Sequence, residues 1–227
     1  MLIQVSLFEG LLVEVLLALL MAAVVRRRRE EAMTALAERD PLTGAFNRRA
    51  FESRAAGILS MAAGGRRRPG ALLLLDIDRF KTINDTYGHA VGDRILVALT
   101  GVLEACLPRE AVLARLGGDE FVILLPESDE AAVQDLGAAI RVRMAREGGR
   151  GLPTGATVSL GAALFGGGPA GLDALMALAD TALYEAKARG RDRLRLRRLE
   201  PPVARAAGGR MPEPASARLS SETGCCA

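Results

Sequence analysis

An unbroken apolar run near the middle of the chain constrains its fold more than any other feature. Residues 71–77 read ALLLLDI, and Asp78 follows, so a hydrophobic segment ends abruptly in carboxylates. An apolar run of this length without polar alternation is typical of a β-strand that is buried on both faces. The sequence therefore predicts a sheet that other elements cover on both sides.

The flanking chain alternates between helical and extended periodicity, which predicts that helices pack on this sheet. Helices are expected at 47–62, 92–107, 129–146 and 172–188, and further strands at 112–115, 121–125, 157–164 and 192–196. With 227 residues, 50% of them hydrophobic, the chain can bury one full core and still carry other segments. We expect one α/β (α+β) domain with a mixed, mostly antiparallel central sheet and packed helices, preceded by an N-terminal helix.

The first 25 residues are almost wholly apolar. As a helix, residues 2–25 would rise ~36 Å, enough to cross a hydrocarbon core of about 30 Å. Glu9 and Glu14 oppose insertion, whereas the arginines at 26–29 mark the cytoplasmic side. We expect 1–25 to anchor a single-pass inner-membrane protein whose folded domain lies in the cytoplasm. The alternative is an amphipathic helix that is buried or binds a partner.

Composition divides the rest of the chain into three parts. Residues 26–39 are rich in helix formers and predict a helical stalk, which ends where Pro41 and Gly44 break the helix. We place the folded domain at 40–199. Residues 200–227 are dominated by Pro, Ala, Gly, Arg and Ser, a composition that predicts a disordered tail.

Charge and residue usage argue against a nucleic-acid partner and against a zinc or disulfide framework. The net charge is only +3, tryptophan is absent and aromatic residues make up 4% of the chain, so stacking platforms for single-stranded nucleic acid are poorly supplied. We therefore expect no nucleic-acid partner. The three cysteines have no zinc-binding spacing and form no secreted disulfide framework, which fits a reducing cytoplasm.

Two acidic clusters carry the strongest chemical signal. Asp76 and Asp78 end the buried strand, where an acid is either a helix cap or a ligand for a hard cation. Asp119 and Glu120 follow two glycines between two short apolar strands, a pattern that predicts a β-hairpin. Such a pair alone could be a solubilising surface turn. Two clusters on strands of one sheet, however, suit Mg²⁺, which binds one or two carboxylates together with substrate phosphates.

The residues around these acids resemble the GGDEF family of diguanylate cyclases. Five motifs stand in the family's order: 40–49 (DPLTGAFNRR), 76–93 (DIDRFKTINDTYGHAVGD), 117–121 (GGDEF), 157–161 (TVSLG) and 184–191 (YEAKARGR). The resemblance covers residues 40–196, with Ala45 where the family usually has leucine. It implies a fold like that of nucleotidyl cyclases and polymerase palms. It also implies an enzyme that condenses two GTP molecules into cyclic di-GMP and two pyrophosphates.

The resemblance assigns the acidic clusters to a metal site. It implies that Asp76, the backbone carbonyl of Ile77 and Asp119 hold Mg²⁺, with Mn²⁺ as the alternative ion, and that Glu120 is a further ligand. Asp119 is then the candidate that takes the proton from the ribose 3′-hydroxyl, and Asp119 and Glu120 are the expected catalytic residues. A carboxylate beside a dication is a weak base, so metal activation should matter more than proton abstraction.

Other residues align with the family's substrate contacts. Asn84 and Asp93 correspond to the residues that bind guanine, whose donors an amide and a carboxylate can satisfy. Taken alone, these two residues read as a turn and a helix cap.

The remaining substrate-binding positions that the resemblance implies are Phe80, Lys81, His89, Lys187 and Arg191, with backbone N–H groups at 79–81 expected on the phosphates. Apart from the resemblance, Lys187 and Arg191 could be ordinary cations near a helix C-terminus, and His89 a polar turn residue.

The resemblance also implies how the domain works with a partner. Each domain holds one GTP and the product contains two phosphodiester bonds, so a homodimer is expected. Family members that their product inhibits often carry an Arg-x-x-Asp site, but here residues 108–111 read PREA, so we expect no primary-site product inhibition. Three alternatives remain: a catalytically silent domain that binds GTP or cyclic di-GMP, a membrane scaffold, and a nucleotidyl cyclase that acts on ATP, against which Asn84 and Asp93 argue.

Overall fold

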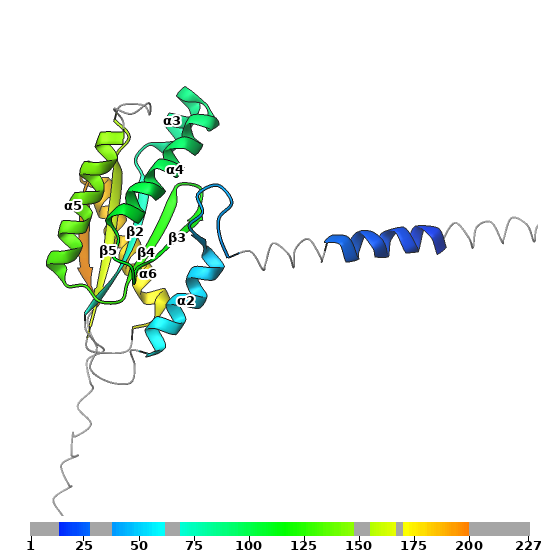
Figure 1. Ribbon diagram of the computed structural model, residues 1–227, viewed down its shortest axis with the longest axis horizontal. Helices are drawn as coiled ribbons and strands as arrows, with labels where there is room; N and C mark the ends of the chain where they lie inside the picture. Colours follow the sequence, from blue (N-terminus) through cyan, green and yellow to red (C-terminus); the bar gives the residue numbers. More distant parts are fainter. Residues whose placement is uncertain (1–13, 28–37, 62–68, 148–154, 167–169, 200–227) are drawn as a thin grey trace, which may run out of the picture.

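The computed structural model describes residues 14–27, 38–61, 69–147, 155–166 and 170–199. One six-stranded sheet, in the order β1-β3-β4-β2-β5-β6, organises the domain (Figure 1). The strands are β1 Phe46–Asn47, β2 Gly70–Ile77, β3 Val112–Gly117, β4 Glu120–Leu125, β5 Val158–Phe165 and β6 Leu194–Arg198. The helices of the domain are α2 Arg48–Met61, α3 Phe80–Tyr87, α4 His89–Cys106, α5 Glu130–Glu147 and α6 Leu172–Ala188.

The strand pairing confirms the predicted mixed, mostly antiparallel sheet. β2 is antiparallel to both β4 and β5, and β3 is antiparallel to β4. Only the outer pairs, β1 with β3 and β5 with β6, are parallel. β2 is an inner strand, and helices cover both faces of the sheet around it, so its apolar run has no solvent-facing side.

Two separate cores cover the two faces of the sheet (Figure 1). Leu73 and Leu75 of β2 face the core made with α4 and α5, whereas Leu72 and Leu74 face the core made with α2 and α6. This alternation follows from the two-residue period of a strand. Even-numbered residues of β2 therefore face α2 and α6, and odd-numbered residues face α4 and α5.

Two elements were not predicted from the sequence. The predicted helix at 92–107 is longer in the structure and is preceded by α3, with Gly88 between the two helices at φ 82°. β1 is only two residues long and exists because it pairs with β3 at the edge of the sheet. The helix predicted at 172–188 matches α6 at both ends.

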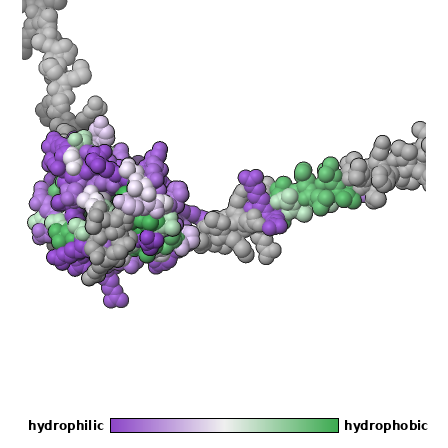
Figure 2. All heavy atoms as spheres, turned by 90° about the horizontal axis from the view of Figure 1, so that it is seen from above, coloured by the Kyte–Doolittle hydropathy of each residue, from purple (hydrophilic) through white to green (hydrophobic). Residues whose placement is uncertain are grey.

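The predicted localisation is wrong. No helix within the described residues is both long and apolar enough to cross a membrane, which contradicts the predicted single-pass inner-membrane protein. The helical residues 14–27 carry exposed apolar side chains, including Leu16 and Leu19 (Figure 2). The same residues include the charged side chains of Glu14, Arg26 and Arg27. Residues 1–13, most of the predicted stalk and the predicted tail lie outside the described residues.

Candidate functional site

The end of β2 brings an acid next to a lysine from α6. Asp76 pairs in register with Glu120 of β4 and with Ser159 of β5. Asp76 lies two residues after Leu74, so its side chain is on the sheet face that α6 covers. Lys187, in the last turn of α6, reaches it with an Nζ–Oδ2 distance of 2.7 Å. The Asp76 side chain is 14% exposed and that of Lys187 is 34% exposed, so the ion pair is partly open to solvent on the lysine side.

The predicted hairpin is present and depends on its two glycines. β3 and β4 are joined through Gly117 at φ 144° and Gly118 at φ 54°, a conformation that L side chains rarely adopt. The register shifts between Arg115 and Gly117, so the strand is irregular just before the turn. Asp119 stands at this turn, one residue before the register position opposite Asp76.

Asp119 precedes Glu120, the residue in register with Asp76, and it lies within electrostatic range of the Asp76 carboxylate. The pKa of Asp119 is raised, first because burial disfavours its charged form and second because the Asp76 carboxylate repels a further negative charge. Glu120 adds a smaller repulsion, and Lys187 opposes these effects only in part. Two carboxylates with incomplete compensation form a donor set that fits a divalent cation.

The other two predicted metal ligands, Ile77 and Glu120, are placed differently from the two aspartates. Ile77 is fully buried, so only its main chain could act as a ligand, as the resemblance implies. Glu120 is exposed and lies in register with Asp76. Among the described residues, no three acidic, histidine or cysteine side chains form a ready metal cluster, and the Lys187 ammonium group contacts Asp76 instead.

Asp78 has a different role from Asp76, although both end the same strand. Its carboxylate is buried and accepts hydrogen bonds from Ser159 Oγ at 2.6 Å, Thr157 Oγ1 at 2.7 Å and the backbone N–H of Asp192 at 3.1 Å. These contacts join β2, β5 and the turn that precedes β6. Sequence reasoning missed this structural role, although the hydroxyls of the 157–161 motif were a signal for it.

The predicted guanine-binding residues lie on α3 and α4. Asn84 is inside α3 and Asp93 is in the second turn of α4, so neither is the turn or helix cap that it could have been. The Oδ1 atom of Asn84 is buried and has no hydrogen-bond partner. A buried amide oxygen without a partner is costly, and a ligand that donates a hydrogen bond would satisfy it.

Gly92 makes the space that Asn84 occupies. A Cβ atom at this position would overlap Asn84 Oδ1 and crowd the ring of Phe80. This requirement gives the glycine of the sequence pair Gly92-Asp93 a physical reason that the sequence alone did not supply. Asp93 itself is exposed on α4, as is His89 at the first position of this helix.

The start of α3 has the geometry of an anion-binding turn. Arg79 adopts a left-handed conformation at φ 58°, and no side chain caps the helix. The N–H groups of Phe80 and Lys81 therefore have no partner within the helix. Arg191 is exposed and also left-handed, at φ 61°, in the turn that Asp78 holds through Asp192.

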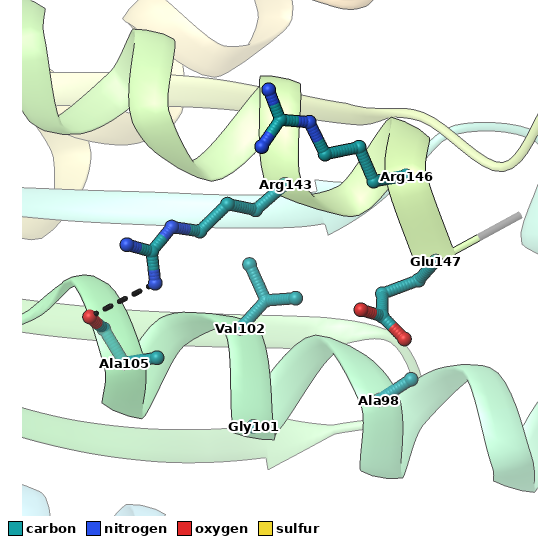
Figure 3. Close-up of a pocket in the computed structure, with 7 residues that line it drawn as sticks. All are labelled: Ala98, Gly101, Val102, Ala105, Arg143, Arg146 and Glu147. Carbon is teal, nitrogen blue, oxygen red and sulfur yellow. Dashed lines mark hydrogen bonds between the residues drawn. The ribbon is translucent and has the colours of Figure 1, made fainter. Parts of the chain in front are cut away.

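A cavity elsewhere in the domain contains none of these residues. It has a volume of about 440 Å³ and lies between α4 and α5, where Arg143 and Glu147 reach toward small residues of α4 (Figure 3). Arg143 Nη1 donates a hydrogen bond of 3.2 Å to the backbone carbonyl of Ala105. The candidate site is thus defined by the charged side chains at the C-terminal end of β2 and not by this cavity.

The raised pKa of Asp119 leads to a stability prediction. Folding makes the charged form of Asp119 less favourable. At a pH above the raised pKa, the charged Asp119 therefore destabilises the metal-free domain. This destabilisation disappears as the pH falls through that pKa and the carboxylate becomes protonated. Asp119→Asn should therefore raise Tm slightly at pH 7 in a chelator, and the gain should vanish in acid. Thermal melts of both proteins from pH 4 to pH 8 measure this, with Asp135→Asn on the exposed face of α5 as the control. A lower Tm for Asp119→Asn at pH 7 would contradict the repulsion.

Comparisons with known proteins identify the family of this domain. Residues 37–193 match the family model described as "Diguanylate cyclase, GGDEF domain". The chain is 41% identical over 169 residues to the diguanylate cyclase DgcM of Escherichia coli strain K12, which covers 73% of this chain and 40% of DgcM. It is 42% identical over 160 residues to DgcP of Pseudomonas aeruginosa, which covers 68% of this chain and 23% of DgcP. The chain therefore spans less than half the length of these curated relatives.

A solved structure extends the likeness to the fold. The GGDEF domain of DgcB from Caulobacter crescentus, solved in complex with c-di-GMP, superimposes with a TM-score of 0.65 and is 31% identical. The match covers 70% of this chain and 95% of that domain. With the family model covering more than half of the chain, and the fold and the acidic hairpin in agreement with it, the chain belongs to the GGDEF domain family of diguanylate cyclases.

Proposed function

We propose that this domain condenses two GTP molecules into cyclic di-GMP and two pyrophosphates, by attack of a ribose 3′-hydroxyl on an α-phosphate. The observation that carries the proposal is the convergence of Asp76, Asp119 and Lys187 at the end of β2. Acids that repel each other beside a lysine suit a cation and a triphosphate together. The names of the relatives support the same reaction.

The acidic cluster is the proposed metal site, and diguanylate cyclases generally use divalent ions. Asp76, the backbone carbonyl of Ile77, Asp119 and Glu120 would hold Mg²⁺, or Mn²⁺ as the alternative. When bound, such an ion supplies positive charge that acidifies the ribose 3′-hydroxyl and stabilises the α-phosphate. Asp119 is the proposed acceptor of the hydroxyl proton, but a carboxylate beside a dication is a weak base, so activation by the metal should matter more.

Lys187 has two uses in this proposal. In the structure its ammonium group neutralises Asp76. With substrate present, a cation at Asp76 would free Lys187 to contact the triphosphate. Arg191, Lys81 and the N–H groups at the start of α3 would hold the other phosphate oxygens, and His89 is a further proposed substrate contact.

Guanine is the proposed base because of Asn84 and Asp93. The unpaired Oδ1 of Asn84 can accept a hydrogen bond from the base, and the Asp93 carboxylate accepts from the ring N–H and amino group of guanine. Adenine has no donor at the equivalent ring position, so it would leave Asp93 unpaired. Selectivity for GTP over ATP therefore follows from these two side chains.

A homodimer is proposed because each domain carries one such site while the product contains two phosphodiester bonds. The primary site for product inhibition is not expected, since Pro108 and Ala111 replace its arginine and aspartate. Cyclic di-GMP added during turnover should then leave the initial rate nearly unchanged.

Asp93→Asn should weaken binding of a non-hydrolysable GTP analogue by about 10- to 100-fold, because a charged hydrogen bond is worth about 1.5–3 kcal/mol. Isothermal titration calorimetry of the full chain measures this affinity. Asp85→Asn is the matched control, since Asp85 is an exposed carboxylate on α3 next to Asn84. Equal affinity of the wild type and Asp93→Asn would contradict the assigned guanine contact.

The reaction itself is tested by incubating the purified chain with Mg²⁺ and either GTP or ATP, and identifying the products by mass spectrometry. We expect cyclic di-GMP from GTP and no cyclic dinucleotide from ATP. A folded dimer that binds GTP but forms no product would instead support a silent nucleotide-binding domain. A dimer that binds no nucleotide would support a scaffold.

A further inference from the structure

One arginine binds the turn of the β3–β4 hairpin, which carries Asp119. Arg115 of β3 donates two hydrogen bonds to the backbone carbonyl of Gly118, from Nε at 3.0 Å and from Nη2 at 2.7 Å. A Cβ atom at Gly117 or Gly118 would meet nothing within 4 Å, so no neighbouring segment packs against the turn in that direction. Gly118 directly precedes Asp119, so the position of this carbonyl sets where Asp119 stands.

The same guanidinium group also binds Asp40, which precedes β1. Arg115 Nη1 lies 3.0 Å from Asp40 Oδ1 and 3.2 Å from Oδ2. The side chains are 13% and 19% exposed, so this pair is better protected from solvent than a typical surface ion pair. Arg115 thus joins two segments that are 75 residues apart in the chain.

Asp40 is itself held in place. It accepts hydrogen bonds from the backbone N–H of Thr43 at 2.9 Å and from Thr43 Oγ1 at 2.7 Å. Burial alone would raise the pKa of Asp40, but the hydrogen bonds from Thr43 and Arg115 outweigh it, and the pKa is lowered. Asp40 therefore stays charged and keeps its hold on Arg115 at neutral pH.

The chain just before Asp40 is docked against the same edge of the sheet. Arg39 forms an isolated bridge with Phe46, and the guanidinium groups of Arg39 and Arg54 lie over the Phe46 ring at 4.6 and 4.1 Å from its centroid. Glu38 forms a 2.8 Å ion pair with Arg54. A displacement of the chain ahead of the domain would therefore be felt at Asp40.

We propose that Arg115 is a positioning residue that holds the Asp119 turn in its working geometry, and that Asp40 couples this turn to the chain ahead of the domain. The inference rests on the proposed function for the role of Asp119. Arg115 touches no predicted substrate contact and acts only through Gly118. Its effect should therefore fall on the rate of turnover and not on guanine binding.

Arg115→Ala should lower kcat by about 10- to 100-fold, since a misplacement of about 1 Å at a catalytic group can have an effect of that size. The affinity for a GTP analogue should stay within about twofold, because Asn84 and Asp93 lie on α3 and α4. Arg115→Lys should recover part of the rate, since a lysine can bind Gly118 or Asp40 but lacks the planar fork that binds both.

Asp40→Ala tests the coupling. Alone it should lower kcat by less than Arg115→Ala, and in the Arg115→Ala background it should add almost nothing, because Asp40 acts through Arg115. Arg198→Ala is the matched control: this arginine forms an exposed ion pair with Glu130 at the opposite edge of the sheet. It should leave the rate unchanged.

Hydrogen exchange supplies a readout that does not need activity. Amides at 117–120 should exchange at least about tenfold faster in Arg115→Ala and in Asp40→Ala than in the wild type, while β2 and β5 keep their protection. Faster exchange confined to the hairpin supports the proposal even if the chain makes no cyclic di-GMP, which would count only against the proposed function. Wild-type exchange at 117–120 in Arg115→Ala overturns it, and so does a full additive effect of the two substitutions on kcat.

Discussion

Asp119→Asn is expected to lower the rate of cyclic di-GMP formation by about 10³-fold or more, because it removes both a charge from the metal site and the proposed proton acceptor. The amide has nearly the shape of the carboxylate, so the hairpin should keep its conformation. Initial rates at saturating GTP and Mg²⁺ measure the effect. A rate within about tenfold of the wild type would show that Asp119 is not at the reacting centre.

Two controls separate this loss from a general defect. The affinity of Asp119→Asn for a GTP analogue without metal should be similar to that of the wild type, because the guanine contacts lie on α3 and α4. Asp135→Asn, on the exposed face of α5, should keep the full rate. If Asp119→Asn loses nucleotide affinity and protection from exchange together, its inactivity reflects unfolding.

Gly161→Ala is expected to lower the free energy of unfolding by about 3 kcal/mol, at the upper end of the range for overpacked cores. A Cβ atom at position 161 of β5 would overlap two backbone atoms of α6, the amide nitrogen of Leu183 and the carbonyl oxygen of Ala179. Backbone cannot rotate away as a side chain can, so α6 must move off the sheet. Urea denaturation of both proteins gives the difference directly.

This substitution also tests whether the packing of α6 positions the site. Lys187 stands in the last turn of α6, so a displaced helix should weaken its contact with Asp76 and reduce turnover in the protein that stays folded. Gly101→Ala is the matched control, because a Cβ at this exposed position of α4 meets nothing within 4 Å. It should be neutral or stabilise by up to about 1 kcal/mol. Similar stability losses for both variants would argue against the close contact at Gly161.

The sequence predicted the elements whose pattern is local. The run in β2, the helix at 172–188 and the hairpin with its two glycines all have signals that lie within a few residues. By contrast, α3 has no buried residue and contains β-branched and turn-forming side chains, so its periodicity is weak. It forms where Phe80 and Ile83 pack against the core, and that contact is not visible in a local pattern.

The roles of Asp76 and Asp78 show why the site could be predicted only in part. Both acids follow the same apolar run, so the local sequence pattern does not distinguish their roles. They differ because β5 offers hydroxyls to Asp78 while α6 offers Lys187 to Asp76. The contact between Arg115 and Asp40 is likewise long-range, so no spacing in the sequence indicated it.

The predicted membrane localisation was wrong, whereas the predicted N-terminal helix is present at 14–27. Apolar composition at 1–25 indicated a membrane anchor, because length and hydropathy were the only criteria that the sequence offered. Within the described residues, no helix is both long and apolar enough to cross a membrane.

The position of a bound divalent ion tests the central claim most directly. Crystals of the chain grown with Mn²⁺ and a non-hydrolysable GTP analogue would place the metal by its anomalous scattering. We predict a peak coordinated by oxygen atoms of both Asp76 and Asp119, with Lys187 turned from Asp76 to the triphosphate. Triphosphate and Mn²⁺ bound away from these acids, with the Lys187–Asp76 ion pair intact, would contradict the account.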